Sequence, residues 1–130
     1  MKKAILIDAK NKKVTEVEAD TLQDYYQLIG CDYVEAIDLK EDTTMYVDEE
    51  SLLKSAYIDE NGEKHGMHGF NIPQLPNTII GNGLVLGFEY ESGETKDCPM
   101  SVEQIEKMIT FVEYDNPQDR PQPSIQVYSW

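Results

Sequence analysis

The chain has 130 residues, 40% of them hydrophobic, and a formal net charge of −14 from 25 acidic and 11 basic side chains. This length allows one domain with one modest core. The excess of acid argues against direct nucleic-acid binding, because phosphate recognition relies on Lys and Arg, and against an anionic membrane surface. An acidic surface often only keeps a protein soluble. Two interpretations of the charge therefore remain: a surface that binds a partner, and a surface that only contacts water.

The N-terminal sequence predicts a cytoplasmic protein. Its basic start is followed by a short apolar run, residues 4–7, that ends at Asp8, whereas a signal peptide requires a longer one. No stretch approaches the ~20 apolar residues of a membrane span. Cys31 and Cys98 are the only cysteines. In a reducing compartment we expect two free thiols, with Cys31 buried, Cys98 exposed and neither activated as a nucleophile.

The first half of the chain predicts strands and one helix. Strands are expected at residues 3–8 and 13–18, and the first, apolar on both faces, should be central in its sheet. Asp20 is predicted to be the N-cap of an amphipathic helix over residues 20–30, since Leu22, Tyr25, Tyr26 and Ile29 recur at helical spacing. Gly30 suits the left-handed residue that follows a helix. Residues 33–39 and 43–48 are expected to form a hairpin.

The second half contains fewer local signals. Residues 49–76 are expected to be an extended loop, because Pro73 and Pro76 exclude a continuous regular element. Asn82-Gly83 between two apolar runs predicts a β-hairpin over residues 78–90. Ser101 and Gln104 form a capping box that begins a second amphipathic helix, residues 101–112.

These elements predict an α+β fold with a mostly antiparallel sheet of about five to seven strands and two amphipathic helices. We expect a single domain over residues 1–116. Residues 117–130 form a Pro-rich C-terminal tail whose last residues alternate like an edge strand.

The two histidines, His65 and His68, are the candidate metal ligands. Three residues apart, they would share one face of a helix and bind a metal together with a carboxylate such as Asp59 or Glu63. Gly66 disfavours that helix, however, and established zinc motifs need more ligands at fixed intervals. The stronger interpretation is a surface loop that contains two histidines.

The tail is the candidate partner-binding element, through the apolar side chains of Ile125, Val127, Tyr128 and Trp130. It could add a strand to the sheet of a protein partner or of a second copy, which would give a homodimer. An equally good interpretation is a final strand on its own sheet. No cofactor is expected, and no nucleophile motif is present that would indicate an enzyme.

A family resemblance is carried by the order and spacing of several segments: residues 1–8, 17–18, 22–30, 33–35, 46–54 and 80–87. Together they resemble a bacterial family known as domain of unknown function 3846, over residues 1 to about 112. The resemblance implies small proteins of bacteria, phages, plasmids and conjugative elements, with no established catalytic or binding residue.

The charge and this setting together predict a non-enzymatic accessory protein of a bacterium or mobile element. It would bind another protein through an acidic surface, and an antidefence role is one version of this hypothesis. The alternative is a small-ligand or metal-binding module that uses the loop of residues 57–77.

Overall fold

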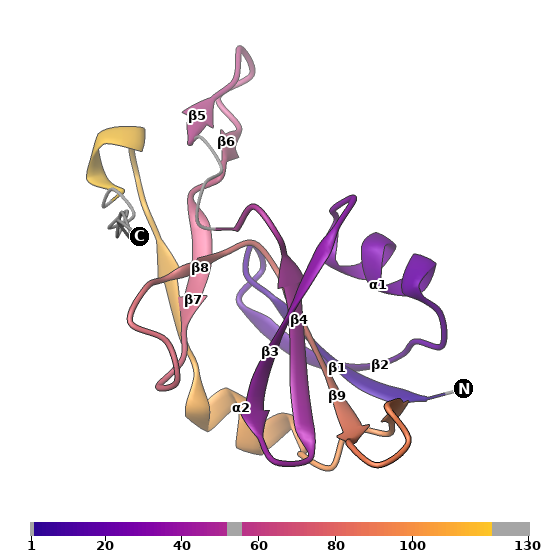
Figure 1. Cartoon of the computed structure of the whole chain (residues 1–130). Coiled ribbons are helices and arrows are strands. Elements are labelled where there is room, and N and C mark those ends of the chain that lie inside the picture. Colours follow the sequence, from indigo (N-terminus) through magenta and orange to yellow (C-terminus); the bar gives the residue numbers. More distant parts are fainter. Residues whose placement is uncertain (1, 52–55, 121–130) are drawn as a thin grey trace, which may run out of the picture.

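The computed structural model describes residues 2–51 and 56–120 of the chain (Figure 1). The first of these segments contains β1 (Lys3–Asp8), β2 (Lys13–Glu18), α1 (Leu22–Ile29), β3 (Val34–Lys40) and β4 (Thr43–Asp48). The second contains β5 (Tyr57–Ile58), β6 (Lys64–His65), β7 (His68–Asn71), β8 (Ile79–Ile80), β9 (Gly83–Glu89), β10 (Glu94–Lys96), α2 (Val102–Met108), β11 (Thr110–Glu113) and the 3-10 helix η1 (Pro117–Asp119).

The strands form one large and two small sheets, and each pair is antiparallel. The six-stranded sheet has the order β2-β1-β9-β4-β3, with β10 also paired to β9. A three-stranded sheet has the order β11-β7-β8, and β5 and β6 form a two-stranded sheet. The predicted α+β class and mostly antiparallel sheet are confirmed, as is the interior position of β1.

The large sheet is buried on both faces. Alternation along β9 sends Leu84 and Leu86 to the face covered by α1, where they meet Tyr25 and Ile29. Val85 points to the opposite face, which α2 and the three-stranded sheet cover. The cluster on that face includes Ile5, Ile7, Met45, Phe70, Ile79 and Ile105. Burying both faces removes the most apolar surface from water and explains the apolar sequence of the central strands.

Helix α1 begins one residue later than the sequence suggested. Its N-cap is Thr21 and not Asp20, because the Thr21 hydroxyl accepts a hydrogen bond from the backbone N–H of Asp24. The Asp24 carboxylate in turn accepts from the backbone N–H of Thr21, which completes a capping box. Leu22, predicted to be on the apolar face, is 52% exposed. Gly30 ends the helix with φ 81°, as predicted.

Helix α2 begins at the predicted capping box, in which Ser101 and Gln104 bond reciprocally. It ends at Met108, however, four residues before the predicted end. Ile109 is extended, and residues 110–113 form β11, which pairs with β7. The apolar residues at helical spacing thus extend past the end of the helix into a strand, where the β-branched Thr110 and Val112 suit a sheet.

Two predictions for the middle of the chain were wrong. Residues 49–76, expected to be an irregular loop, contain β5, β6 and β7. The hairpin expected over residues 78–90 is absent, because β8 pairs with β7 whereas β9 joins the large sheet. A type I′ turn requires positive φ at both central residues, and Asn82 does not have it. Its side chain instead accepts from the backbone N–H of Ala9 at 3.0 Å.

The cysteines also differ from expectation. Cys98 is buried, at 2% exposure, and Cys31 is only partly buried. The backbone N–H of Cys98 bonds to the carbonyl of Lys3, which draws residue 98 against β1. Burial raises the pKa of the Cys98 thiol, which agrees with the prediction that it is not an activated nucleophile.

Candidate functional site

An open cleft of about 760 Å³ lies where the end of α1 meets the start of β3 and the end of β4. Its lining includes Tyr26 from α1, Asp32 and Tyr33 from the connection to β3, and Asp48, Glu49 and Glu50 from the end of β4. None of the described residues that line it is basic. The cleft therefore combines four carboxylates with two aromatic rings.

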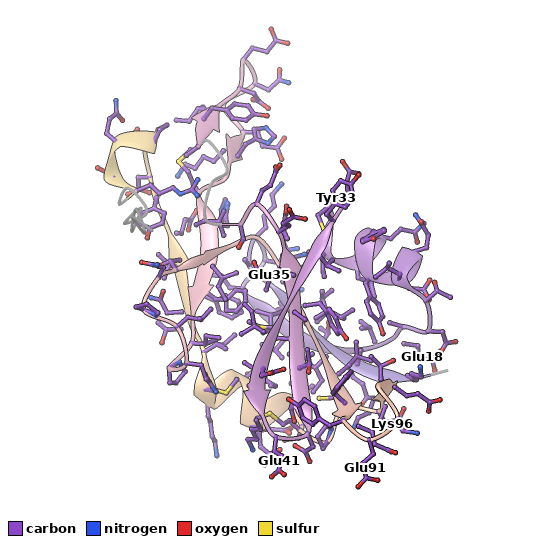
Figure 2. All side chains as sticks on the ribbon, viewed as in Figure 1. Glu18, Tyr33, Glu35, Glu41, Glu91 and Lys96 are labelled. Atoms are coloured by element: carbon purple, nitrogen blue, oxygen red, sulfur yellow. The ribbon has the colours of Figure 1, made fainter. Side chains whose placement is uncertain are left out.

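The cleft wall is built by two tight turns. Gly30 and Cys31 both donate backbone hydrogen bonds to the carbonyl of Tyr26, so the chain leaves α1 sharply. The backbone N–H of Glu49 then bonds to the carbonyl of Tyr33, which joins the two walls. The side chain of Tyr33 is 69% exposed at the start of β3 (Figure 2).

Asp48 stabilises the turn that carries Glu49 and Glu50 at the edge of the cleft. This residue is buried, and its carboxylate accepts from the backbone N–H of Glu50 at 2.9 Å. The backbone N–H of Ser51 bonds to the Asp48 carbonyl at the same distance. These bonds fix a turn that presents the exposed side chains of Glu49 and Glu50 to solvent.

The predicted histidines lie on a second feature, the arm, which we define as the β5–β6 hairpin of residues 57–65. The arm projects from the body of the protein (Figure 1). Its turn is held by Asp59, whose Oδ1 accepts from the backbone N–H groups of Asn61 and Glu63, both at 2.9 Å. Gly62 supplies the positive φ of 79° that the turn requires.

His65, on β6, is positioned by Tyr57 on β5 and by Asp59 in the turn between the two strands. Its Nε2 lies 2.9 Å from Oδ2 of Asp59, and its ring stacks on that of Tyr57 with centroids 4.5 Å apart. This hydrogen bond is the main cause that lowers the pKa of Asp59. Glu63 pairs with Lys10 from the β1–β2 turn, and that bond lowers the pKa of Glu63 and raises the pKa of Lys10.

His68 contacts a different carboxylate. It begins β7, and its Nε2 lies 3.2 Å from a carboxylate oxygen of Glu113 on β11. The other oxygen of Glu113 lies 3.2 Å from Lys12 Nζ, and the bond to Lys12 is the main cause that lowers the pKa of Glu113. His65 and His68 line one cavity of about 260 Å³, but each faces its own carboxylate.

Ligand atoms of His65, Asp59 and Glu63 lie within 4.8 Å of one another, which is close enough to surround one metal ion. Among the described residues this is the one such group, and His68 is outside it. Both carboxylates were named from the sequence as neighbours of the histidines. Lys10 was missed, since nothing in the sequence connects the first turn to a hairpin over fifty residues later.

The cleft itself was also missed, because it is assembled from two segments that are separate in the sequence, residues 23–33 and 48–50, and the only sequence signal was the general abundance of carboxylates. The tail residues Ile125, Val127, Tyr128 and Trp130 lie outside the described residues. No helix in the described part of the chain is long and apolar enough to cross a membrane.

Comparison with known proteins places the chain in a family. A model of the family described as "Domain of unknown function (DUF3846)" matches residues 1–110. The chain belongs to this family. The DUF3846 match contains both the cleft and the arm. A search of curated proteins finds no match, and a search of solved structures finds none either.

Proposed function

We propose that the protein is a non-enzymatic accessory protein that binds a cationic segment of another protein in the acidic cleft. The observation that supports this is the composition of the cleft, which brings four carboxylates and two tyrosines together without a described basic side chain. Its volume, about 760 Å³, is in the range of ligand-binding clefts, ~300–1,000 Å³.

The distribution of ion pairs supports the same site. Most of the described lysines already pair with carboxylates elsewhere: Lys3, Lys10, Lys12, Lys64 and Lys96. Asp32, Glu49 and Glu50 form no ion pair with a described basic residue. Uncompensated charge in a concave surface focuses the electrostatic field, so a cation from outside gains most there.

The tyrosines favour arginine as the cation. A guanidinium can stack on an aromatic face while its N–H groups bond to carboxylates, which a lysine ammonium does less well. Tyr33 and Tyr26 contribute aromatic rings to a cleft whose rim is acidic. We therefore propose an Arg-containing peptide segment as the occupant. We place this binding in the cytoplasm of a bacterium or of the host of a mobile element, with antidefence as one version.

A peptide that alternates Arg and Gly, labelled with a fluorophore, tests the proposal by fluorescence anisotropy. The cleft variant carries Asp32→Asn, Glu49→Gln and Glu50→Gln. A matched control carries Glu18→Gln, Glu41→Gln and Glu91→Gln, three exposed positions that do not line the cleft and change the net charge equally (Figure 2).

We expect the cleft variant to bind the Arg peptide roughly tenfold more weakly, from about 0.5 kcal/mol for each exposed pair. The control should lose less than about twofold, and a Lys-Gly peptide should bind more weakly than the Arg peptide. Equal losses in the two variants would mean that the peptide responds only to net charge, and the cleft proposal would be wrong.

A further inference from the structure

We propose that Asp59, Glu63 and His65 on the arm bind one Zn²⁺ ion. Their ligand atoms lie within 4.8 Å of one another. Imidazole nitrogen and carboxylate oxygen are both ordinary zinc ligands, and three protein ligands leave a fourth position for water. Two carboxylates and a neutral imidazole also balance the double positive charge of the ion.

Two of the three ligands are held in place by bonds that zinc would leave intact. Oδ1 of Asp59 is held by the backbone N–H groups of Asn61 and Glu63, so Oδ2 is the oxygen directed at His65. The imidazole of His65 is stacked on Tyr57 at an interplanar angle of 12°. Ligands that are already ordered lose less conformational entropy on binding, which favours affinity.

The third ligand, Glu63, is paired with Lys10 and must exchange this partner for the metal. Lys10 is an exposed side chain, at 61%, so it can turn into solvent when the ion binds. An exposed ion pair is weak in water. Lys10 therefore acts as a competitor of the metal, and removing its charge should strengthen binding. If the cluster had only a structural role, removing the charge of Lys10 would not strengthen zinc binding.

The donor set selects among metals. Calcium takes six to eight oxygen ligands and magnesium retains several of its waters, whereas this cluster offers three groups of which one is a nitrogen. Imidazole together with carboxylate suits zinc better than either hard cation. Bound zinc would also link the turn of the arm to β6, in addition to the strand pairs Tyr57 with His65 and Ile58 with Lys64.

Isothermal titration of the full chain with ZnCl₂ in a non-chelating buffer tests the site. We expect one ion per chain. Lys10→Met should bind about fivefold more tightly, the factor for one unit charge at about 4 Å in bulk water. His65→Ala should bind at least about tenfold more weakly. Glu63→Gln, which changes an exposed side chain and leaves the turn intact, should weaken binding to a similar degree.

His68→Ala is the matched control, because His68 lies on the same cavity but outside the cluster. Its zinc affinity should stay within about twofold of the unmodified chain, and Ca²⁺ should not compete. The proposal is overturned if the unmodified chain takes up no Zn²⁺ at about 1 mM. It is also overturned if Lys10→Met has no effect, or if His68→Ala weakens binding as much as His65→Ala.

Discussion

Replacing Gly83 with alanine should destabilise the protein, because this glycine makes room for the packing of the three-stranded sheet against the large one. A Cβ at position 83 would lie 2.9 Å from Cζ of Phe70 on β7 and 3.1 Å from Sδ of Met45 on β4. Both neighbours are fully buried, so neither can move without disturbing the core. Overpacking of this kind costs about 1–3 kcal/mol.

A second effect opposes the first. Alanine restricts the unfolded chain more than glycine and would contribute about 0.4–1 kcal/mol of stability. The close contacts with Phe70 and Met45 outweigh this term, so the free energy of unfolding of Gly83→Ala should fall by roughly 0.5–2 kcal/mol. Urea unfolding followed by circular dichroism measures the change as a lower midpoint with an unchanged slope.

A double variant separates overpacking from other causes. Phe70→Leu removes the ring atom that a Cβ at Gly83 would meet. Together, the two substitutions should therefore cost about 1 kcal/mol less than the sum of the single changes. The packing argument is refuted if Gly83→Ala leaves the midpoint unchanged, or if the two losses simply add.

Two further predictions concern the start of α1. Thr21→Ala removes the side-chain acceptor of the capping box and should lower the free energy of unfolding by about 1 kcal/mol. Asp20→Ala should lower it by less. Equal urea midpoints of the two variants would contradict the assignment of Thr21 as the N-cap. The pKa of Asp24 is lowered by hydrogen bonds from the backbone N–H groups of Asp20 and Thr21. Its stabilisation is therefore present above its unfolded pKa and lost as pH falls through the folded one, so Asp24→Asn should show a smaller loss of stability between about pH 5 and about pH 3. Parallel acid profiles of the two proteins would count against this bond.

Local signals in the sequence were enough to predict much of the fold. The bounds of β1 follow from a short apolar run, those of β2 from alternation, and the end of α1 from Gly30, a residue that tolerates positive φ. The capping box at Ser101 is equally local. Each of these features depends on residues at most a few positions apart, which is the range that periodicity and capping rules cover.

The failures arise where a distant partner decides the conformation. Asn82 and Gly83 look like a hairpin turn, but the Asn82 side chain bonds to the backbone of Ala9 and also donates to the carbonyl of Leu28. The apolar spacing predicted that residues 109–112 continue α2, yet residues 110–112 pair with β7. Such choices depend on free energies of tertiary contact that no single segment reveals.

In the candidate sites too, local features could be predicted from the sequence and long-range contacts could not. The grouping of His65 with Asp59 and Glu63 was within reach of the sequence, because the three residues lie within one short hairpin. The pairing of Glu63 with Lys10 was not, and neither was the cleft. The cleft exists only because the backbone of Glu49 bonds to Tyr33 and joins two segments that are separate in the sequence.

The two sites use the acidic charge of the chain in opposite ways. In the cleft, Glu49 and Glu50 lack a described cationic partner, so a ligand must bring positive charge from outside. On the arm, Glu63 is already paired with Lys10, so a metal must displace an ammonium ion. Salt screens the attraction between the cleft and a cationic ligand. On the arm, salt also weakens the Lys10–Glu63 ion pair that competes with the metal. Binding to the cleft should therefore depend more strongly on ionic strength than binding to the arm.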